Sequence, residues 1–144
     1  NGSRGDQQKE AHMTDIEKTL ALKTWAVVGA NNNKDKFGYK IFKCINGTGN
    51  YKVYPVNPGL IEVMGHKCYP TLADLPEKPD VVDVVVPPRV GEQIMRDCAA
   101  AGIKYVWLQP GADAPAVAEL GEKLGLTVLK ACVMAELRKR GATD

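Results

Sequence analysis

Short runs of apolar residues alternate along the chain with segments in which apolar positions recur every three or four residues. The apolar runs predict strands over residues 25–29, 51–56, 81–86, 105–108 and 127–129. The periodic segments predict helices over residues 37–45, 90–101 and 115–124. This alternation is typical of a parallel sheet covered by helices on both faces. The sequence therefore predicts an α/β fold: a single doubly wound domain with a mostly parallel sheet of five or six strands.

The rest of the chain flanks or interrupts this pattern. Residues 1–12 are polar and lack apolar periodicity, which indicates a flexible tail or a remnant of recombinant expression. We assign 13–140 to the folded domain and 141–144 to a C-terminal tail, with 136–144 read as a short basic helix or frayed end. Thr14 and Glu17 have capping-box spacing, which predicts a helix to about Leu22. Residues 57–76 are rich in proline and glycine and predict a long crossover with a minor strand near Val63 and a helical turn over 71–75.

Composition limits the possible classes of protein. The chain has 144 residues, of which 44% are hydrophobic and 25% charged, as in an ordinary single domain with no room for a second catalytic domain. Its four cysteines are widely spaced and contain no C-x-x-C pair, which argues against a zinc site. No apolar run resembles a signal sequence or a membrane span. We therefore expect a cytoplasmic protein with reduced thiols, no metal and no membrane association.

The net charge of +2 conceals an uneven distribution. Residues 33–52 contain five lysines against Asp35, a local charge of +4 that leaves the rest of the chain weakly acidic. No basic stripe interleaved with aromatic residues accompanies these lysines, so nucleic acid is not an expected partner. The positive charge instead points to a compact anion near the first predicted strand.

The loop after that strand has the features of a phosphate site. It reads Val27-Val-Gly29-Ala-Asn-Asn-Asn-Lys-Asp-Lys-Phe-Gly38. Gly29 would allow a sharp turn and a close approach to a phosphate, Gly38 would allow close packing, and the following helix would favour an anion. Lys34, Lys36 and Lys40 could meet further phosphates. The alternatives remain open that this is a Gly- and Asn-rich turn without a ligand and that the lysines lie on a solvated helix face.

The loop after the second strand argues against a nicotinamide dinucleotide. Such a site normally has an acidic residue there to hold the ribose hydroxyls, whereas this chain has Tyr54-Pro-Val-Asn-Pro58. A neutral edge braced by prolines suits a nucleotide whose ribose carries its own phosphate, or one whose adenine rests on apolar backbone. Asn57 would bond to ribose or base, or simply form a turn before Pro58.

Two further loops end at the same edge of the predicted sheet. Val85-Val-Pro-Pro-Arg89 stops the most buried strand and predicts a groove wall, in which Arg89 binds a phosphate or is merely solvated. In Trp107-Leu-Gln-Pro-Gly111 we expect Gln109 to face the crevice as a neutral polar group and Trp107 to belong to the core.

Catalytic groups are scarce at these edges. The chain contains no G-x-S-x-G, H-E-x-x-H or Walker motif and no evident nucleophile and base pair, so we assign no catalytic residue. His66 is expected to be a surface or capping residue, and Cys132 a buried, inert thiol. An acid–base role for His66 and a crevice-facing role for Cys132 stay open as alternatives.

Five motifs together resemble the small stand-alone CoA-binding proteins, which are similar to the CoA-binding domain of the succinyl-CoA synthetase α subunit. They are Gly29-Ala-Asn with Lys36-Phe-Gly38-Tyr, Tyr54-Pro-Val-Asn-Pro58, Gly65-His-Lys-Cys-Tyr-Pro70, Val86-Pro-Pro88 and Trp107-Leu-Gln-Pro-Gly111. The resemblance spans about residues 22–136 and implies a Rossmann-like domain that holds coenzyme A.

The resemblance also implies a role for each loop. The phosphates would lie against Gly29, Ala30, Asn31, Lys36 and Gly38, the adenosine between Val56, Asn57 and Pro58, and the pantetheine beside Val86, Pro87 and Pro88. We add Lys34, Phe37, Arg89 and Gln109, from the same loops, to the candidate cofactor site. The synthetase has a lysine in the loop after its second strand, and this chain has none there. We therefore expect Lys34, Lys36 or Lys40 to bind the 3′-phosphate.

The resemblance predicts a binding protein without catalysis, because the synthetase's phosphorylated histidine and its second domain have no counterpart here. Such a protein would serve as a sensor, a carrier or an accessory to an unidentified acyl-CoA enzyme. The alternatives are a small NAD(P)-linked or acyl-CoA-dependent enzyme, or a redox-regulated CoA binder, using Cys132 or His66.

Overall fold

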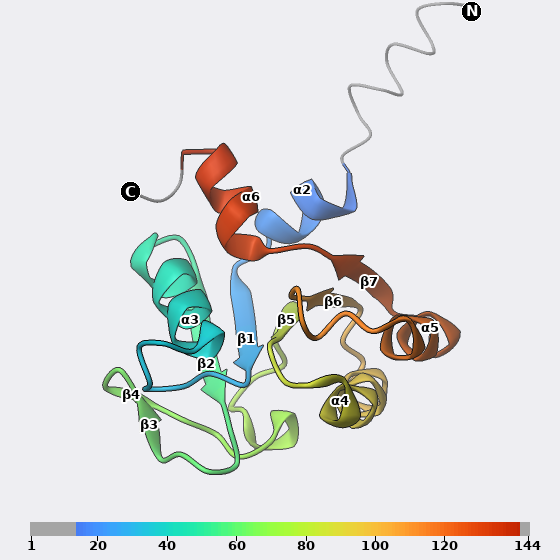
Figure 1. Ribbon diagram of the computed structural model, residues 1–144, viewed down its shortest axis with the longest axis horizontal. Helices are drawn as coiled ribbons and strands as arrows, with labels where there is room; N and C mark the ends of the chain where they lie inside the picture. The colour runs from blue at the N-terminus through green and yellow to red at the C-terminus, as the bar shows by residue number, and fades with distance from the viewer. Residues whose placement is uncertain (1–13, 142–144) are drawn as a thin grey trace, which may run out of the picture.

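The computed structural model describes residues 14–141, so the expected tail over 1–12 and most of the tail over 141–144 lie outside the described part. Five parallel strands form the central sheet in the order β2-β1-β5-β6-β7 (Figure 1). The strands are β1 (Thr24–Val28), β2 (Lys52–Val56), β5 (Val81–Val84), β6 (Tyr105–Leu108) and β7 (Thr127–Lys130). The helices are α2 (Asp15–Leu20), α3 (Phe37–Gly47), α4 (Pro88–Ala100), α5 (Pro115–Lys123) and α6 (Val133–Lys139). The predicted doubly wound α/β fold is confirmed.

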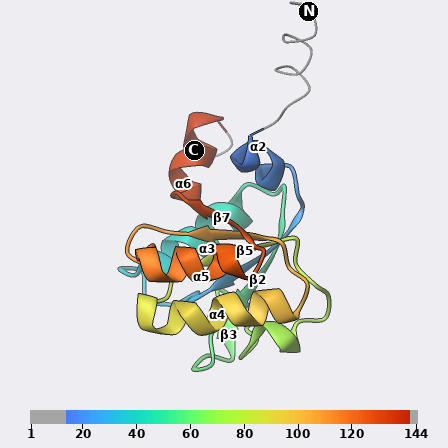
Figure 2. The same ribbon diagram turned by 90° about the vertical axis from the view of Figure 1, so that its right-hand side faces the viewer.

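Helices cover both faces of the sheet. Figure 2 shows α4 and α5 side by side on one face, while α3, α6 and α2 lie on the other. Because side chains alternate along a strand, Val82 and Val84 of β5 face α4, whereas Val81 and Asp83 face α3 and α6. All four residues of β5 are buried, as expected of an interior parallel strand.

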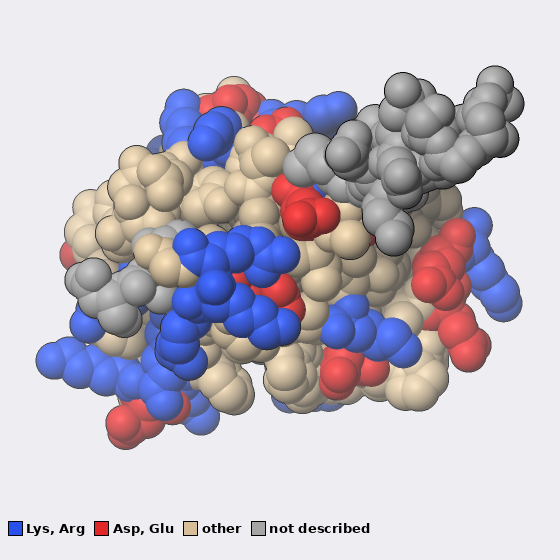
Figure 3. Space-filling model, turned by 90° about the horizontal axis from the view of Figure 1, so that it is seen from above, with Lys and Arg blue, Asp and Glu red and all other residues tan. Residues whose placement is uncertain are grey.

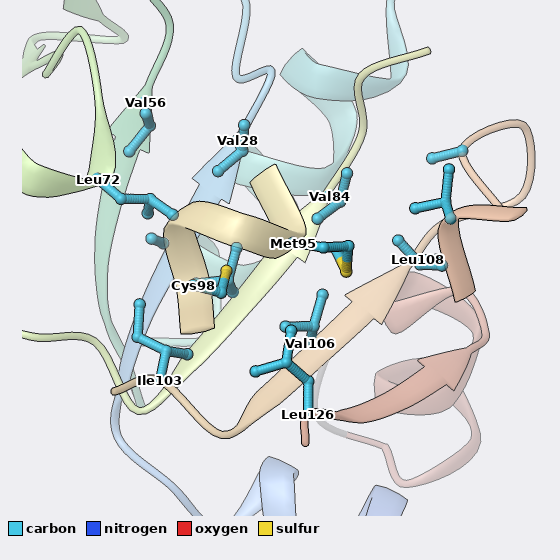
Figure 4. Packing of buried hydrophobic residues seen from close by; sticks show 14 of the residues in the cluster. Val28, Val56, Leu72, Val84, Met95, Cys98, Ile103, Val106, Leu108 and Leu126 are labelled. Carbon is cyan, nitrogen blue, oxygen red and sulfur yellow. The ribbon is translucent and has the colours of Figure 1, made fainter. Parts of the chain in front are cut away.

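The apolar layer under α4 holds that helix against the sheet. Met95 and Cys98 of α4 are wholly buried against a cluster that includes Val28, Val84 and Val106 (Figure 4). Gly121 of α5 allows this helix to pack closely against the layer, since a Cβ there would lie 2.7 Å from Val128 and 2.9 Å from the sulfur of Met95. The tight packing makes α4 and α5 a rigid support for the loops at the edge of the sheet.

The long crossover between β2 and β5 contains a small hairpin that was only partly predicted. Strand β3 (Glu62–Val63) pairs antiparallel with β4 (His66–Lys67), and a 3-10 turn, η1, follows at Leu72–Asp74. The minor strand near Val63 is thus confirmed, but its partner β4 was not predicted, because two-residue strands leave no periodicity to read.

Several boundaries differ by one to three residues from the sequence prediction, and two of them have a physical reason in the structure. Strand β5 ends at Val84 rather than Val86: the N–H of Val85 still donates to the carbonyl of Val28 at 2.9 Å, but the chain then turns into α4. Helix α6 begins at Val133, not Glu136, because Val133 and Leu137 are buried one helical turn apart. The capping box of Thr14 and Glu17 at the start of α2 is confirmed.

The strand order determines where a ligand crevice can form. From β1 the chain crosses to β2 on one side and later returns to β5 on the other, so the connections diverge between β1 and β5. In doubly wound sheets a crevice opens at this point, at the carboxyl ends of the strands. The loops after Val28 and Val84 therefore meet where a nucleotide would bind.

Within residues 14–141, no helix is both long and apolar enough to cross a membrane.

Candidate functional site

Two glycines allow the loop after β1 to pack against its neighbours. Gly29 has a φ of +101°, and a Cβ on it would lie 3.1 Å from Cγ1 of Val86 and 3.2 Å from the carbonyl carbon of Val85. At Gly38, in the first turn of α3, a Cβ would lie 1.9 Å from the carbonyl oxygen of Gly29 and 3.2 Å from the amide nitrogen of Asn31. The start of α3 is thus pressed directly against the loop, as the motif predicted.

Asparagine side chains hold the loop in shape. Oδ1 of Asn31 accepts from the amide of Asn33 at 2.7 Å, and Oδ1 of Asn33 accepts from the amide of Asp35 at 3.0 Å. Asn32 reaches the hairpin, where its Nδ2 donates to the carbonyl of Glu62 at 2.8 Å. These asparagine side chains therefore stabilise the turn itself. This structural role was one of the two roles that the sequence left open for the loop.

This construction leaves main-chain donors at the edge of the sheet. The backbone N–H groups of Ala30, Asn31 and Asn32 have no acceptor among residues 14–141. The first N–H groups of α3 lie beside them, since the Cβ position of Gly38 is 3.2 Å from the nitrogen of Asn31. No side chain caps α3 at Lys36. Free amides and an uncapped helix start suit the phosphates of a nucleotide cofactor.

The loop after β2 is tied to the phosphate loop through Asn57. Its Nδ2 donates to the carbonyl of Ala30 at 2.9 Å, and its Oδ1 accepts from the amide of Gly59 at 2.9 Å. The buried Val56 accepts from the amide of Gly29 at 2.9 Å through its carbonyl, while Pro58 is exposed. Asn57 thus connects the two loops, and a contact of its remaining N–H with a ligand stays a prediction.

The loop after β5 forms the opposite wall of the crevice. Val86 is half-buried beside Gly29, Pro87 is exposed, and Pro88 opens α4. Arg89 is exposed in the first turn of α4 and takes part in no ion pair among residues 14–141. The structure therefore brings the predicted residues of the first, second and third loops to one edge.

Gln109 differs from its expected position. Its side chain does not face the crevice: only 2% of the residue is exposed, and its Nε2 donates to Oδ1 of Asp83 at 2.6 Å. Burial raises the pKa of Asp83 to about 8, and the bond from Gln109 opposes this rise. The sequence interpretation missed Asp83, although an acidic residue inside an otherwise apolar interior strand is a visible signal. Trp107 is wholly buried, as predicted.

Two lysines in the loop and one just after it are exposed to solvent. Lys34, Lys36 and Lys40 are exposed, and Nζ of Lys40 lies 5.8 Å from the centre of the Phe37 ring, itself 52% exposed. Figure 3, which looks onto α6 and α2, shows another basic group at the end of α6. In that group Glu136 pairs with both Lys139 and Arg140, so its positive charge is partly neutralised.

A pocket of about 580 Å³ lies next to the loop after β2. Its lining residues come from that loop and from the β3–β4 hairpin: Pro58, Leu60, Ile61, Glu62, Gly65, Lys67, Cys68 and Pro70. Lys67 was not predicted as a site residue, because its position in this pocket depends on the pairing of the hairpin. Its Nζ lies 5.1 Å from the centre of the Tyr69 ring.

His66 lies in β4 of the hairpin and Cys132 at the start of α6. The His66 ring packs against Phe42, with centroids 5.5 Å apart, and its Nε2 is 3.4 Å from Nδ2 of Asn46 in the second half of α3. Cys132 is half-buried at the start of α6 and has no hydrogen-bonded base among the described residues. Neither is therefore paired with a second catalytic group in the described part of the chain.

Comparisons with known proteins agree with this geometry. A family described as "CoA binding domain" matches residues 23–138. An ADP-forming acetate–CoA ligase II from Archaeoglobus fulgidus is 34% identical over 91 residues, which are 62% of this chain but only 14% of the ligase. A hypothetical protein from Pyrococcus horikoshii has a TM-score of 0.81 at 32% identity, covering 88% of this chain and 92% of that one. A conserved hypothetical protein from Pyrococcus furiosus has a TM-score of 0.74 at 39% identity, covering 79% and 98%.

The family match spans the sheet, the phosphate loop and both neighbouring loops. The likeness to small solved proteins over nearly their whole length agrees with the predicted stand-alone type. The chain therefore belongs to the CoA-binding domain family, and its cofactor is coenzyme A.

Proposed function

We propose that this chain binds coenzyme A at the carboxyl edge of the sheet and carries out no chemistry on it. The diphosphate would lie against the loop from Gly29 to Gly38, the adenosine toward the loop after β2, and the pantetheine along Val86 and the two prolines that follow. The observation that carries this proposal is the set of free amides at Ala30, Asn31 and Asn32, pressed against the uncapped start of α3. A diphosphate is the group of the cofactor that such donors recognise.

The adenosine end has a neighbouring pocket of suitable size and character. Pro58 and Leu60 provide apolar surface for a base, and Lys67 contributes a positive charge, next to Glu62 on the opposite strand of the hairpin. Lys67 therefore joins Lys34, Lys36 and Lys40 as a candidate for the 3′-phosphate. Lys67 is our first candidate to replace the missing lysine after the second strand, because it lines one pocket together with Pro58 and Leu60 of the loop after β2.

The absence of catalysis is supported by the arrangement of the reactive side chains. His66 packs on the flank of α3, and Cys132 lacks a partner base within residues 14–141. Burial raises the pKa of the Cys44 and Cys68 thiols, which keeps them in the less reactive protonated form. The chain also corresponds to a small part of the matching ligase, so the remaining parts of a ligase reaction would need other domains.

Calorimetric titration with coenzyme A, dephospho-CoA and NADH tests the binding proposal. We expect coenzyme A to bind at micromolar concentration, dephospho-CoA at least tenfold more weakly, and NADH more weakly still. A hydrogen-bonded ion pair to the 3′-phosphate is worth about 1.5–3 kcal/mol, which corresponds to a factor of about 10 to 150. Absence of any heat with millimolar coenzyme A would refute the proposal.

A pair of lysine variants locates the 3′-phosphate. Lys67→Ala should reduce the preference for coenzyme A over dephospho-CoA about tenfold, whereas Lys104→Ala should leave it unchanged. Lys104 is a matched control, because it is also exposed and its Nζ lies 5.3 Å from a tyrosine ring, but it precedes β6 at the opposite edge of the sheet. If Lys67→Ala keeps the preference, the same measurement on Lys34, Lys36 and Lys40 variants identifies the residue.

The enzyme alternative makes a different prediction. Turnover of an acyl-CoA or of a nicotinamide cofactor by the purified protein, lost in Cys132→Ala or His66→Ala, would replace the non-catalytic proposal. We expect instead that both variants bind coenzyme A as the wild type does and that neither substrate is consumed.

A further inference from the structure

A buried acid lies one residue before the carboxyl end of β5, the strand that leads into one wall of the candidate cofactor site. Asp83 is the third residue of β5, has no exposed surface, and lies two residues before Val85, whose carbonyl carbon is within 3.2 Å of the Cβ position of Gly29. Gln109 is the first residue after β6 and is 2% exposed. The pair therefore joins two neighbouring strands near their carboxyl ends, at the edge of the sheet where the candidate site lies.

The hydrogen bonding of this pair is incomplete if the acid is ionised. Nε2 of Gln109 donates to Oδ1 of Asp83 at 2.6 Å, but Oδ2 of Asp83 and Oε1 of Gln109 have no partner within the described residues. Two unpaired buried acceptors side by side are costly, and a buried carboxylate without a cation is costlier. A proton on Oδ2 removes the charge and turns one of these acceptors into a donor.

The surroundings provide no compensating positive charge. On the neighbouring strands Asp83 stands beside Val27 and Trp107, neither of which ionises. From the covering helices the ionisable groups near this face are the thiols of Cys44 and Cys132, neither of which can be cationic. Arg138 of α6 acts on Cys44 but is exposed, and Asp83 takes part in no ion pair within residues 14–141. The surroundings of Asp83 on this face of the sheet therefore favour the protonated carboxyl group over the carboxylate.

Gln109 connects the carboxyl group of Asp83 to the edge of the sheet through hydrogen bonds. Its amide donates to the carbonyl of Val84 at 3.2 Å, and its carbonyl accepts from the amide of Ala112 at 2.8 Å. The same residue thus bonds the end of β5 through its main chain and the middle of β5 through its side chain. A charge on Asp83 would draw water between the two strands at the point where the crevice walls begin.

We propose that Asp83 is a proton-dependent positioning residue: its neutral carboxyl group and Gln109 lock the ends of β5 and β6, and loss of the proton to a base in solution unlocks them and weakens cofactor binding. This inference rests on the proposed function for its readout. Since burial raises the pKa of Asp83 to about 8, the switch operates in mildly alkaline solution.

The test compares the wild type with Asp83→Asn, whose amide has nearly the shape of the neutral acid and cannot lose a proton in this range. The dissociation constant for coenzyme A is measured by calorimetry from pH 6.5 to pH 9.5. Asp80→Asn is the matched control, because Asp80 is an exposed acid just before the same strand. Ionisation of the cofactor's own groups is common to all three proteins and cancels in the ratio of their dissociation constants.

We expect the ratio of the wild-type constant to that of Asp83→Asn to rise about tenfold between pH 7 and pH 9, as follows for a binding-competent form that loses its proton near pH 8. The ratio of the wild type to Asp80→Asn should stay constant. A flat ratio for Asp83→Asn overturns this inference alone, whereas failure of all three proteins to bind coenzyme A at any pH overturns the proposed function and this inference with it.

The titration of Asp83 can also be measured in the wild-type protein, so this second test does not depend on whether a variant folds. Carbon-13 NMR of labelled aspartate carboxyl groups should show one resonance that titrates near pH 8, and the amide signals of Gln109 and Gly111 should shift with the same midpoint. Titration of every aspartate below pH 6 would overturn the inference, as would amide signals that do not follow the carboxyl group.

Discussion

A methyl group at position 38 would collide with the loop that we assign to the phosphates of coenzyme A. In Gly38→Ala the new Cβ would lie 1.9 Å from the carbonyl oxygen of Gly29, where real Cβ contacts essentially never fall below 3.0 Å. The loop and the start of α3 must therefore separate by about 1 Å. Overpacking of this kind costs roughly 1–3 kcal/mol of folding free energy.

The same displacement would move the amides of the loop away from the positions that we assign to the phosphates of coenzyme A. A hydrogen bond formed at about 2.9 Å is largely lost when donor and acceptor move about 1 Å apart. Losing one or two bonds to a charged group at about 1.5–3 kcal/mol each predicts a decrease in affinity of at least tenfold. Calorimetry would measure the dissociation constant, and urea denaturation the free energy of unfolding.

Gly47→Ala is the control for this experiment. Gly47 is the last residue of the same helix, and a Cβ there would have no atom within 4 Å. The change should leave cofactor affinity unchanged and stabilise α3 by up to about 1 kcal/mol, because alanine favours the helix. Wild-type affinity in Gly38→Ala would show that the phosphates do not lie on this loop.

Three further predictions concern stability and reactivity. The pKa of Asp83 is about 8 in the folded protein against an ordinary value of 3.8, so folding binds a proton and the free energy of unfolding should fall as the pH rises from about 4 to about 8. One proton limits this slope to about 1.4 kcal/mol per pH unit, and equal slopes for wild type and Asp83→Asn in urea denaturation would contradict the assignment. Trp107→Phe should cost about 2 kcal/mol, because the buried indole donates to Oγ1 of Thr19 at 3.0 Å and the smaller ring leaves a void; a loss below about 0.5 kcal/mol in the same assay would count against that bond. Burial raises the pKa of the Cys98 thiol to about 12, so iodoacetamide at pH 8 should label Cys98 only after denaturation, and rapid labelling of the native protein, read by peptide mass spectrometry, would refute its burial.

Much of the fold follows from local patterns. Strand β6 begins and ends where the apolar run from Tyr105 to Leu108 does, and the capping box at Thr14 opens the first described helix as predicted. The end of β5 could not be predicted in this way, because a parallel strand ends where its neighbours stop pairing with it. The start of α6 was missed, because its buried face depends on the sheet beneath it.

Some residues of the candidate site could likewise be predicted from local patterns, and others could not. Gly29 and Gly38 were predicted from their places in the loop between the first strand and the next helix, where glycine permits a close approach of the loop to the helix. Gln109 was placed correctly at the edge of the sheet but with its side chain turned the wrong way. Its partner Asp83 stands 26 residues earlier in the chain, and no local pattern connects the two.

The sequence by itself determined the alternation of strands and helices, the loop to which we assign the phosphates and the family to which the chain belongs. These properties depend on residues that are close together along the chain or on motifs that occur in a set order. Only the tertiary structure decided that Lys67 lines a pocket together with the loop after β2 and that Asp83 is buried and hydrogen-bonded to Gln109. Both depend on which segments pack side by side, because charge and hydrogen bonding are set by neighbours in space.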